Sequence, residues 1–192
     1  MQHDIITQYN ELQSVITSVN QELNTLLAQH GKQIVESFFT PLVDLGIKQI
    51  YWTQYTPFFN DGDACEFTIY DVFINSDSEA SIDNYPEWQN GWTTGWELVY
   101  SFKEFVPPND TSWRKYTIVD IAQLEQEAIS RKEYAISLGY NEPLANAVSQ
   151  ALANLTDKFA QSENLLKETF GDHVSIAWRH GSGFTVEHHD HD

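Results

Sequence analysis

The chain has 192 residues, 41% hydrophobic and 14% aromatic, and its 28 acids against 10 bases give a formal net charge of −18. This much apolar material is enough for the core of one folded domain, and it excludes an intrinsically disordered chain. The charge excludes direct binding to nucleic acids and to anionic membranes, so we expect charged partners to be basic proteins, cationic ligands or metal ions. A charge of this size also keeps a protein in solution without any partner.

The cysteine content and the start of the chain indicate the compartment. Cys65 is the only cysteine, so no internal disulfide can form, which fits a reducing cytoplasm. Residues 1–10 are polar and predict no secretion signal. No apolar run approaches the length of a membrane span. We therefore expect a cytoplasmic protein that does not associate with a membrane.

Residues 4–45 are predicted to be helical. Asp4 is a suitable N-cap, and the pattern weakens at Gly31, resumes as far as Phe39 and ends at Gly46. Apolar residues recur in this segment at alternating steps of three and four, namely Tyr9, Leu12, Ile16, Val19, Leu23 and Leu26. A seam this narrow is typical of a helix that packs on another helix.

Residues 47–106 form an acidic and aromatic section that is predicted to be β-structure. Runs at 47–55 and 67–74 flank a turn-rich segment, which predicts a hairpin with a long loop, and the alternation over 96–102 predicts a further strand. Between Ile50 and Phe102 this section has no lysine or arginine, yet that range contains nine carboxylates, namely Asp61, Asp63, Glu66, Asp71, Asp77, Glu79, Asp83, Glu87 and Glu97. We expect a sheet with a negative outer face.

The last part of the chain is predicted to hold two helices and a hairpin. Apolar periodicity predicts both helices within 117–170, and alternation on either side of a glycine turn predicts a β-hairpin over 173–189. The predicted architecture is a single α+β domain over 1–192. It has an antiparallel sheet of about five strands, two hairpins plus a central strand, packed against long helices at both ends of the chain. The long helices could pair within one chain or form a homodimer.

The loop after the first predicted strand contains the sharpest candidate site. Asp61 and Asp63 flank a glycine, with Glu66 just beyond, and such oxygen ligands could hold Ca²⁺ or Mg²⁺. The same residue types also suit a simple turn. Phe58 and Phe59 are either buried beneath this loop or exposed as an anchor for a partner.

Two further groups of residues are candidates for binding. Trp88, Trp92 and Trp96 recur every four residues and could line a sugar site, cage a cation or pack in the core. Three histidines near the C-terminus, His188, His189 and His191, resemble a metal-chelating tract or a frayed tail. No nucleophile motif and no phosphate-binding loop is present, so we assign no catalytic residue and expect a protein that is not an enzyme.

The segment Tyr51-Trp52-Thr53-Gln54-Tyr55-Thr56-Pro57-Phe58-Phe59-Asn60-Asp61-Gly62-Asp63 resembles a motif of uncharacterised tailed-bacteriophage proteins, of the WTQYTPxFNDGD type. The C-terminal residues from Gly183 to Asp192 are similar to theirs as well. This family has no assigned activity, so the resemblance implies a setting rather than residue roles. It implies a non-structural phage protein in the cytoplasm of an infected bacterium.

Three functional hypotheses follow from the sequence. The first is a non-enzymatic phage protein of the anti-defence type, which inhibits or sequesters a host protein or a small polar ligand. Its predicted contact residues are Trp52, Tyr55, Phe58, Phe59, Asn60, Asp61, Asp63, Glu66, Trp88 and Trp92. The second is an enzyme, metal-dependent or carbohydrate-active, that uses Asp61, Asp63 and Glu66, so a divalent cation is the one cofactor considered. The third is a structural or assembly role through the long helices.

Overall fold

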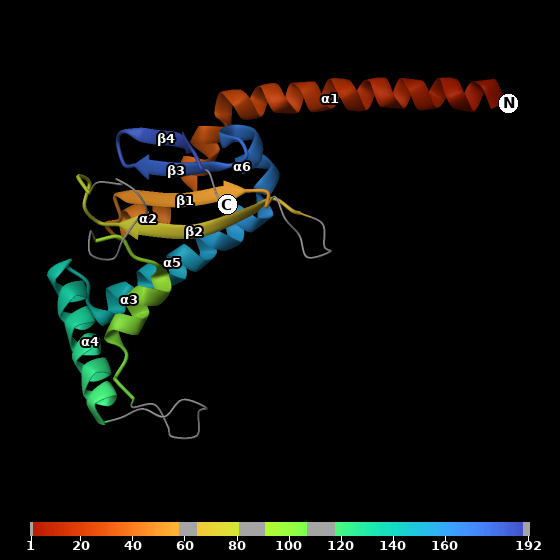
Figure 1. Ribbon diagram of the computed structural model, residues 1–192. Coiled ribbons are helices and arrows are strands. Elements are labelled where there is room, and N and C mark those ends of the chain that lie inside the picture. Colours follow the sequence, from red (N-terminus) through yellow and green to blue (C-terminus); the bar gives the residue numbers. More distant parts are fainter. Residues whose placement is uncertain (1, 58–64, 81–90, 107–117, 190–192) are drawn as a thin grey trace.

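The computed structural model describes residues 2–57, 65–80, 91–106 and 118–189. Helices and strands within these residues form an α+β fold, as the sequence predicts (Figure 1). In chain order the elements are α1 (Gln2–Ser37), α2 (Thr40–Asp44), β1 (Gln49–Tyr55), β2 (Thr68–Asn75), α3 (Gly95–Phe102), α4 (Ile118–Ser137), α5 (Glu142–Gln161), α6 (Glu163–Phe170), β3 (Val174–Arg179) and β4 (Gly183–His188).

The four described strands make one antiparallel sheet in the order β2-β1-β3-β4. Both predicted hairpins are confirmed, and the C-terminal hairpin joins the sheet because β3 pairs with β1. An isolated bridge between Ile74 and Thr93 extends the sheet by one residue beyond β2. Strand β1 therefore has a neighbour on each side, and six of its seven residues are buried, including the polar Gln49, Thr53 and Gln54.

The core lies between the sheet and the helices on one of its faces. Ile50 and Trp52 of β1 are fully buried there and pair across the sheet with Trp178 and Ile176 of β3. Phe39, Phe159 and Phe170 come from the helical segments and surround the ring of Trp52 or of Trp178. On the opposite face the ring of Tyr51 contacts Phe73 and Trp92. Strand β1 is thus covered on both faces.

The predicted strand over 96–102 is wrong, because this segment is helix α3. Thr94 and Glu97 form a reciprocal capping box at its start, and the buried residues Gly95, Leu98 and Ser101 follow a helical spacing of three. Trp96 and Tyr100 are exposed and stack on each other with ring centroids 4.9 Å apart. Alternation over only seven residues did not separate a strand from a short helix.

The long helices also differ from the prediction in where they are continuous and where they are interrupted. Helix α1 runs unbroken through Gly31, and the predicted last helix is split at Ser162 into α5 and α6. Gly31 and Val35 are buried where the C-terminal end of α1 packs on α6. The rest of α1 projects away from the sheet, so the first and last helices do not pair along their lengths (Figure 1).

Candidate functional site

Seven of the thirteen candidate binding or metal residues lie outside the described residues. These are Phe58, Phe59, Asn60, Asp61, Asp63, Trp88 and His191. The structure places the other candidates, which are Trp52, Tyr55, Glu66, Trp92, His188 and His189.

Trp52 and Trp92 are core residues rather than contact residues. Their exposed fractions are 0% and 1%, so a partner reaches neither side chain in this structure. The Trp52 indole donates a hydrogen bond to Gln54 Oε1 at 3.1 Å, which satisfies its one polar group inside the core. Trp96, in contrast, is 67% exposed. Trp92 and Trp96 therefore do not line a common sugar or cation site.

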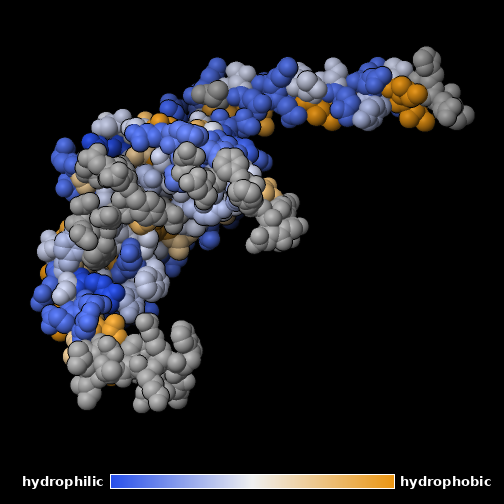
Figure 2. Space-filling model, in the orientation of Figure 1, coloured by the Kyte–Doolittle hydropathy of each residue, from blue (hydrophilic) through white to orange (hydrophobic). Residues whose placement is uncertain are grey.

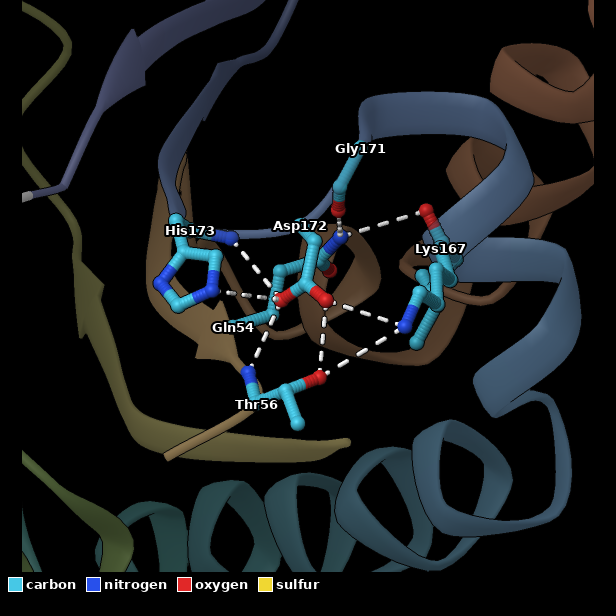
Figure 3. Close-up of polar contacts among 7 residues, drawn as sticks. Gln54, Thr56, Lys167, Gly171, Asp172 and His173 are labelled. Carbon is cyan, nitrogen blue, oxygen red and sulfur yellow. Dashed lines mark hydrogen bonds and ion pairs between the residues drawn. The ribbon is translucent and has the colours of Figure 1, made fainter. Parts of the chain in front are cut away.

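A cluster of polar residues meets where β1 ends, and we call Thr56, Lys167, Asp172 and His173 the Asp172 cluster (Figure 3). The Thr56 amide donates to Asp172 Oδ1 at 2.8 Å, and its hydroxyl donates to Oδ2 at 2.7 Å. Lys167 Nζ lies 2.9 Å from Oδ2. The backbone amide of His173 donates to Oδ1 at 3.0 Å. Both carboxylate oxygens are therefore fully engaged.

These donors fix the protonation state of Asp172. Burial by itself would raise the pKa of this carboxyl group, but the hydrogen bonds from Lys167, from the Thr56 side chain and amide, and from the His173 amide lower its pKa to about 2. At neutral pH the group is a paired carboxylate. It is too weak a base to remove a proton from a substrate at that pH.

The turn that holds Asp172 is built by the end of α6. Gly171 ends this helix with φ 99°, and His173 also has a positive φ of 55°. The buried side chain of Gln54 donates to the Gly171 carbonyl at 2.6 Å and to the Leu166 carbonyl at 3.2 Å. The amide of Gln54 thus joins the strand to one carbonyl within α6 and to the carbonyl of the residue that ends it. Strand β1 and the turn are thereby held together.

An aromatic group lies beside this cluster. The rings of Tyr55 and Tyr70 stack with centroids 4.2 Å apart, and the rings of His189 and His173 lie 5.6 Å and 6.4 Å from that of Tyr55. Tyr55 and His189 are two predicted candidates from opposite ends of the chain, and the structure brings them together. His188, the next candidate, is exposed.

The Asp172 cluster and the aromatic group hold both ends of the segment 58–64. We call the flanking residues 55–57 and 65–67 the loop stem. On the first side Thr56 is bound by Asp172, and on the second side Lys167 Nζ lies 5.2 Å from the centre of the Phe67 ring. Lys167 therefore contacts both sides, since it also lies 3.5 Å from the Thr56 hydroxyl. The chain is thus anchored at Thr56, directly after β1, and contacted at Phe67, directly before β2.

The chemistry open to the Asp172 cluster is limited. The Thr56 hydroxyl is a donor to a carboxylate, and Lys167 is in an ion pair, so neither is an activated nucleophile. Across the described ranges, no three His, Cys, Asp or Glu side chains are grouped to hold a metal ion. Glu66 is exposed at the second side of the loop stem. The arrangement is suited to fixing a backbone rather than to catalysis.

The described carboxylates of the acidic section lie in three places. Glu66 precedes β2, Asp77 and Glu79 follow the other end of β2, and Glu97 accepts a hydrogen bond from the Thr94 amide in the cap of α3. In the part of the chain that the structure describes, none of them forms an ion pair with lysine or arginine. They stay unneutralised, but they do not form one continuous patch.

Sequence reasoning missed Lys167 and Asp172, although it singled out the motif that they hold. The helix stop at Gly171, with two polar residues directly after it, was the available signal. Thr56 and Asp172 are 116 residues apart, so their pairing depends on β3 lying beside β1. A single sequence does not show which strands are neighbours in the sheet.

None of the described helices combines the length and the apolar character needed to cross a membrane. Comparison of the chain with family models, with curated proteins and with solved structures finds no match.

Proposed function

We propose that this chain is a non-enzymatic binding protein that presents the segment 58–64 to a basic partner. The observation that supports this most directly is the loop stem, because Lys167 of α6 and Asp172 of the turn after it contact both of its sides. Segments held in this way by a rigid scaffold are where binding residues are concentrated in proteins.

The charge of the chain supports a basic partner. The net charge is −18, and the segment between the two sides of the loop stem contributes Asp61 and Asp63 with no base. Carboxylates that have no internal counter-charge attract cationic groups and accelerate their association. Within the setting that the motif implies, the proposed partner is a protein of the host bacterium that the phage protein blocks or sequesters.

The Asp172 cluster supports binding over catalysis. Its threonine, lysine and carboxylate are engaged with one another, and the low pKa of Asp172 keeps it from acting as a general base at neutral pH. A cluster of this kind stabilises a backbone conformation. This is the requirement for presenting a loop.

The test is a quantitative capture experiment from lysate of the bacterial host. The wild-type chain is compared with Asp61→Lys/Asp63→Lys, which reverses the charge of the loop, and with Asp44→Lys/Asp157→Lys, which changes the net charge equally at two exposed helix positions. We expect a defined basic protein to be retained by the wild type and by the control, and lost from the loop variant. Equal retention by all three chains, or no retained protein at low salt, would contradict the proposal.

A further inference from the structure

The longest helix of the protein carries an apolar seam that the rest of the chain leaves uncovered. We call residues 5–26 of α1 the arm. Seven of its apolar side chains are between 48% and 63% exposed, namely Ile5, Tyr9, Leu12, Ile16, Val19, Leu23 and Leu26. Hydrophobic groups appear along the projecting helix in Figure 2, well away from the body of the protein.

The spacing of the seam residues is that of a coiled coil. From Ile5 to Leu26 the steps alternate between four and three, so all seven residues occupy successive d and a positions of a heptad repeat. The arm is about 33 Å long, at 1.5 Å per residue. Three heptads without a polar residue in the seam are the pattern of a helix that packs on another helix along its whole length.

The body of the protein does not provide that second helix. Helix α1 reaches α6 only near its C-terminal end, where Gly31 and Val35 are buried. The Trp178 indole fixes this end by donating to the Glu36 carboxylate at 3.0 Å. Before Gly31, no described apolar side chain of α1 is buried. The arm thus leaves the body with its seam exposed over its full length.

Charge at the edges of the seam favours an identical helix as the occupant. The e and g positions that flank it are mostly uncharged, namely Ile6, Gln8, Gln13, Val15, Asn20, Leu27 and Gln29, with Glu22 as the one acid. In a parallel pair Glu22 lies opposite Leu27 of the second copy, so two copies meet without like-charge repulsion at the seam. A helix selected for a different partner would instead use charges at these positions to specify it.

We propose that two copies of this chain associate through their arms as a two-stranded coiled coil. The occupant of the seam is a second copy, and the inference does not depend on the proposed function. Apolar residues at every a and d position of the arm are the pattern by which two-stranded coils pair.

The test is sedimentation analysis of the full chain over a range of concentrations. We expect a particle of two chains that dissociates on dilution. The variant Leu12→Gln/Ile16→Gln/Leu23→Gln replaces three seam residues without adding charge, and leucine and glutamine have similar helix propensities. Its dissociation constant should rise by more than about 100-fold, since three apolar layers become polar. The matched control Thr17→Gln/Ser18→Gln/Thr25→Gln places three glutamines on the outer face of the arm and should stay dimeric.

Three results would overturn the inference. One is a wild-type protein that remains monomeric at every concentration, because the seam would then bind a different protein. Another is a dimer that survives the seam substitutions, because it would then use another surface. The third is equal weakening by the seam variant and the outer-face control. Near-ultraviolet circular dichroism of each variant verifies that the body, whose described tryptophans are remote from the arm, remains folded. The sedimentation experiment contains no host protein. A failure of the dimer proposal therefore does not bear on the outcome of the capture experiment.

Discussion

Asp172 is the residue on which the anchoring of the loop stem depends, and its titration gives a direct measure of that anchoring. The pKa of this carboxyl group is lowered from 3.8 to about 2 in the folded chain. A carboxyl group whose pKa is lowered by folding stabilises the fold fully above its unfolded pKa. That contribution is lost as the pH falls through the folded value, so the relevant window runs from about pH 4 down to about pH 2.

We expect Asp172→Asn to lose this part of the pH dependence. The difference in unfolding free energy between wild type and variant should be about 1 kcal/mol larger at pH 5 than near pH 2, after allowance for screening by solvent. Urea unfolding at several pH values measures it, and taking the difference removes the titration of the other carboxylates. A difference that does not change with pH would show that the cluster does not stabilise the charged form.

Gly31 controls how the arm is joined to the body, at the scale of the elements α1 and α6. A methyl group on Gly31 would overlap the Thr169 side chain, and rotation of that side chain gives little relief because its Cβ would lie only 3.1 Å away. We expect Gly31→Ala to destabilise the fold by about 1–3 kcal/mol, as overpacking does. Thermal or urea unfolding of the variant measures this.

The control for this prediction is the substitution Thr169→Ala. The Thr169 hydroxyl is buried without a hydrogen-bond partner among the described atoms, so its removal alone should cost little. In the Thr169→Ala background, Gly31→Ala should be less destabilising, because the hydroxyl and the methyl group that it would overlap are gone while the contact with the Cβ remains. If Gly31→Ala alone instead stabilises the fold by about 1 kcal/mol, as at an exposed helix position, the packing described here is wrong.

Most of the elements could be predicted from the sequence because their patterns are long. The hairpin around the motif and the C-terminal hairpin follow from alternation next to turn residues, and α4 follows from its periodicity. The strand prediction for 96–102 was wrong because this segment begins with a helix cap. Thr94 and Glu97 form that capping box, and it was not recognised in the sequence. The break at Ser162 has no strong local signal, since apolar periodicity continues across it.

The site was harder to predict than the elements. Tyr55 was predicted as a contact residue from the motif, and the structure places it in a group of aromatic and histidine rings. Trp52 and Trp92 were expected at the surface, but composition alone does not separate a contact tryptophan from a core tryptophan. The partners of Thr56 are brought to it by the pairing of β1 with β3, which is a property of the tertiary structure.

For the whole molecule, we predict no resident divalent cation, and thermal unfolding tests this prediction. Thr56, Lys167 and Asp172 are engaged with one another, so we expect no rise in Tm beyond about 1 °C with Ca²⁺, Mg²⁺ or Mn²⁺ relative to Na⁺ at equal ionic strength. The sodium control is needed because salt screens a net charge of −18 and stabilises the chain by itself. A larger rise that disappears in Asp61→Asn/Asp63→Asn would favour the metal-dependent alternative.

The arm and the loop stem lie on different parts of the whole molecule and suggest a division of roles. The arm provides an apolar surface for a second copy, and the loop stem is fixed to the sheet by Asp172. A dimer of two such chains would carry two loops, so a partner with two basic sites would bind it more tightly through the effective concentration of the second loop.

The dissociation constant of Thr56→Val for the captured host protein tests the central claim most directly. This substitution removes the hydroxyl that donates to Asp172 but leaves every carboxylate of the loop in place. If the stem serves to present the loop, binding should weaken at least about tenfold relative to wild type and to Thr25→Val, an exposed control on α1. Equal affinity of all three chains would contradict the account, because the anchoring of the loop would then have no part in binding.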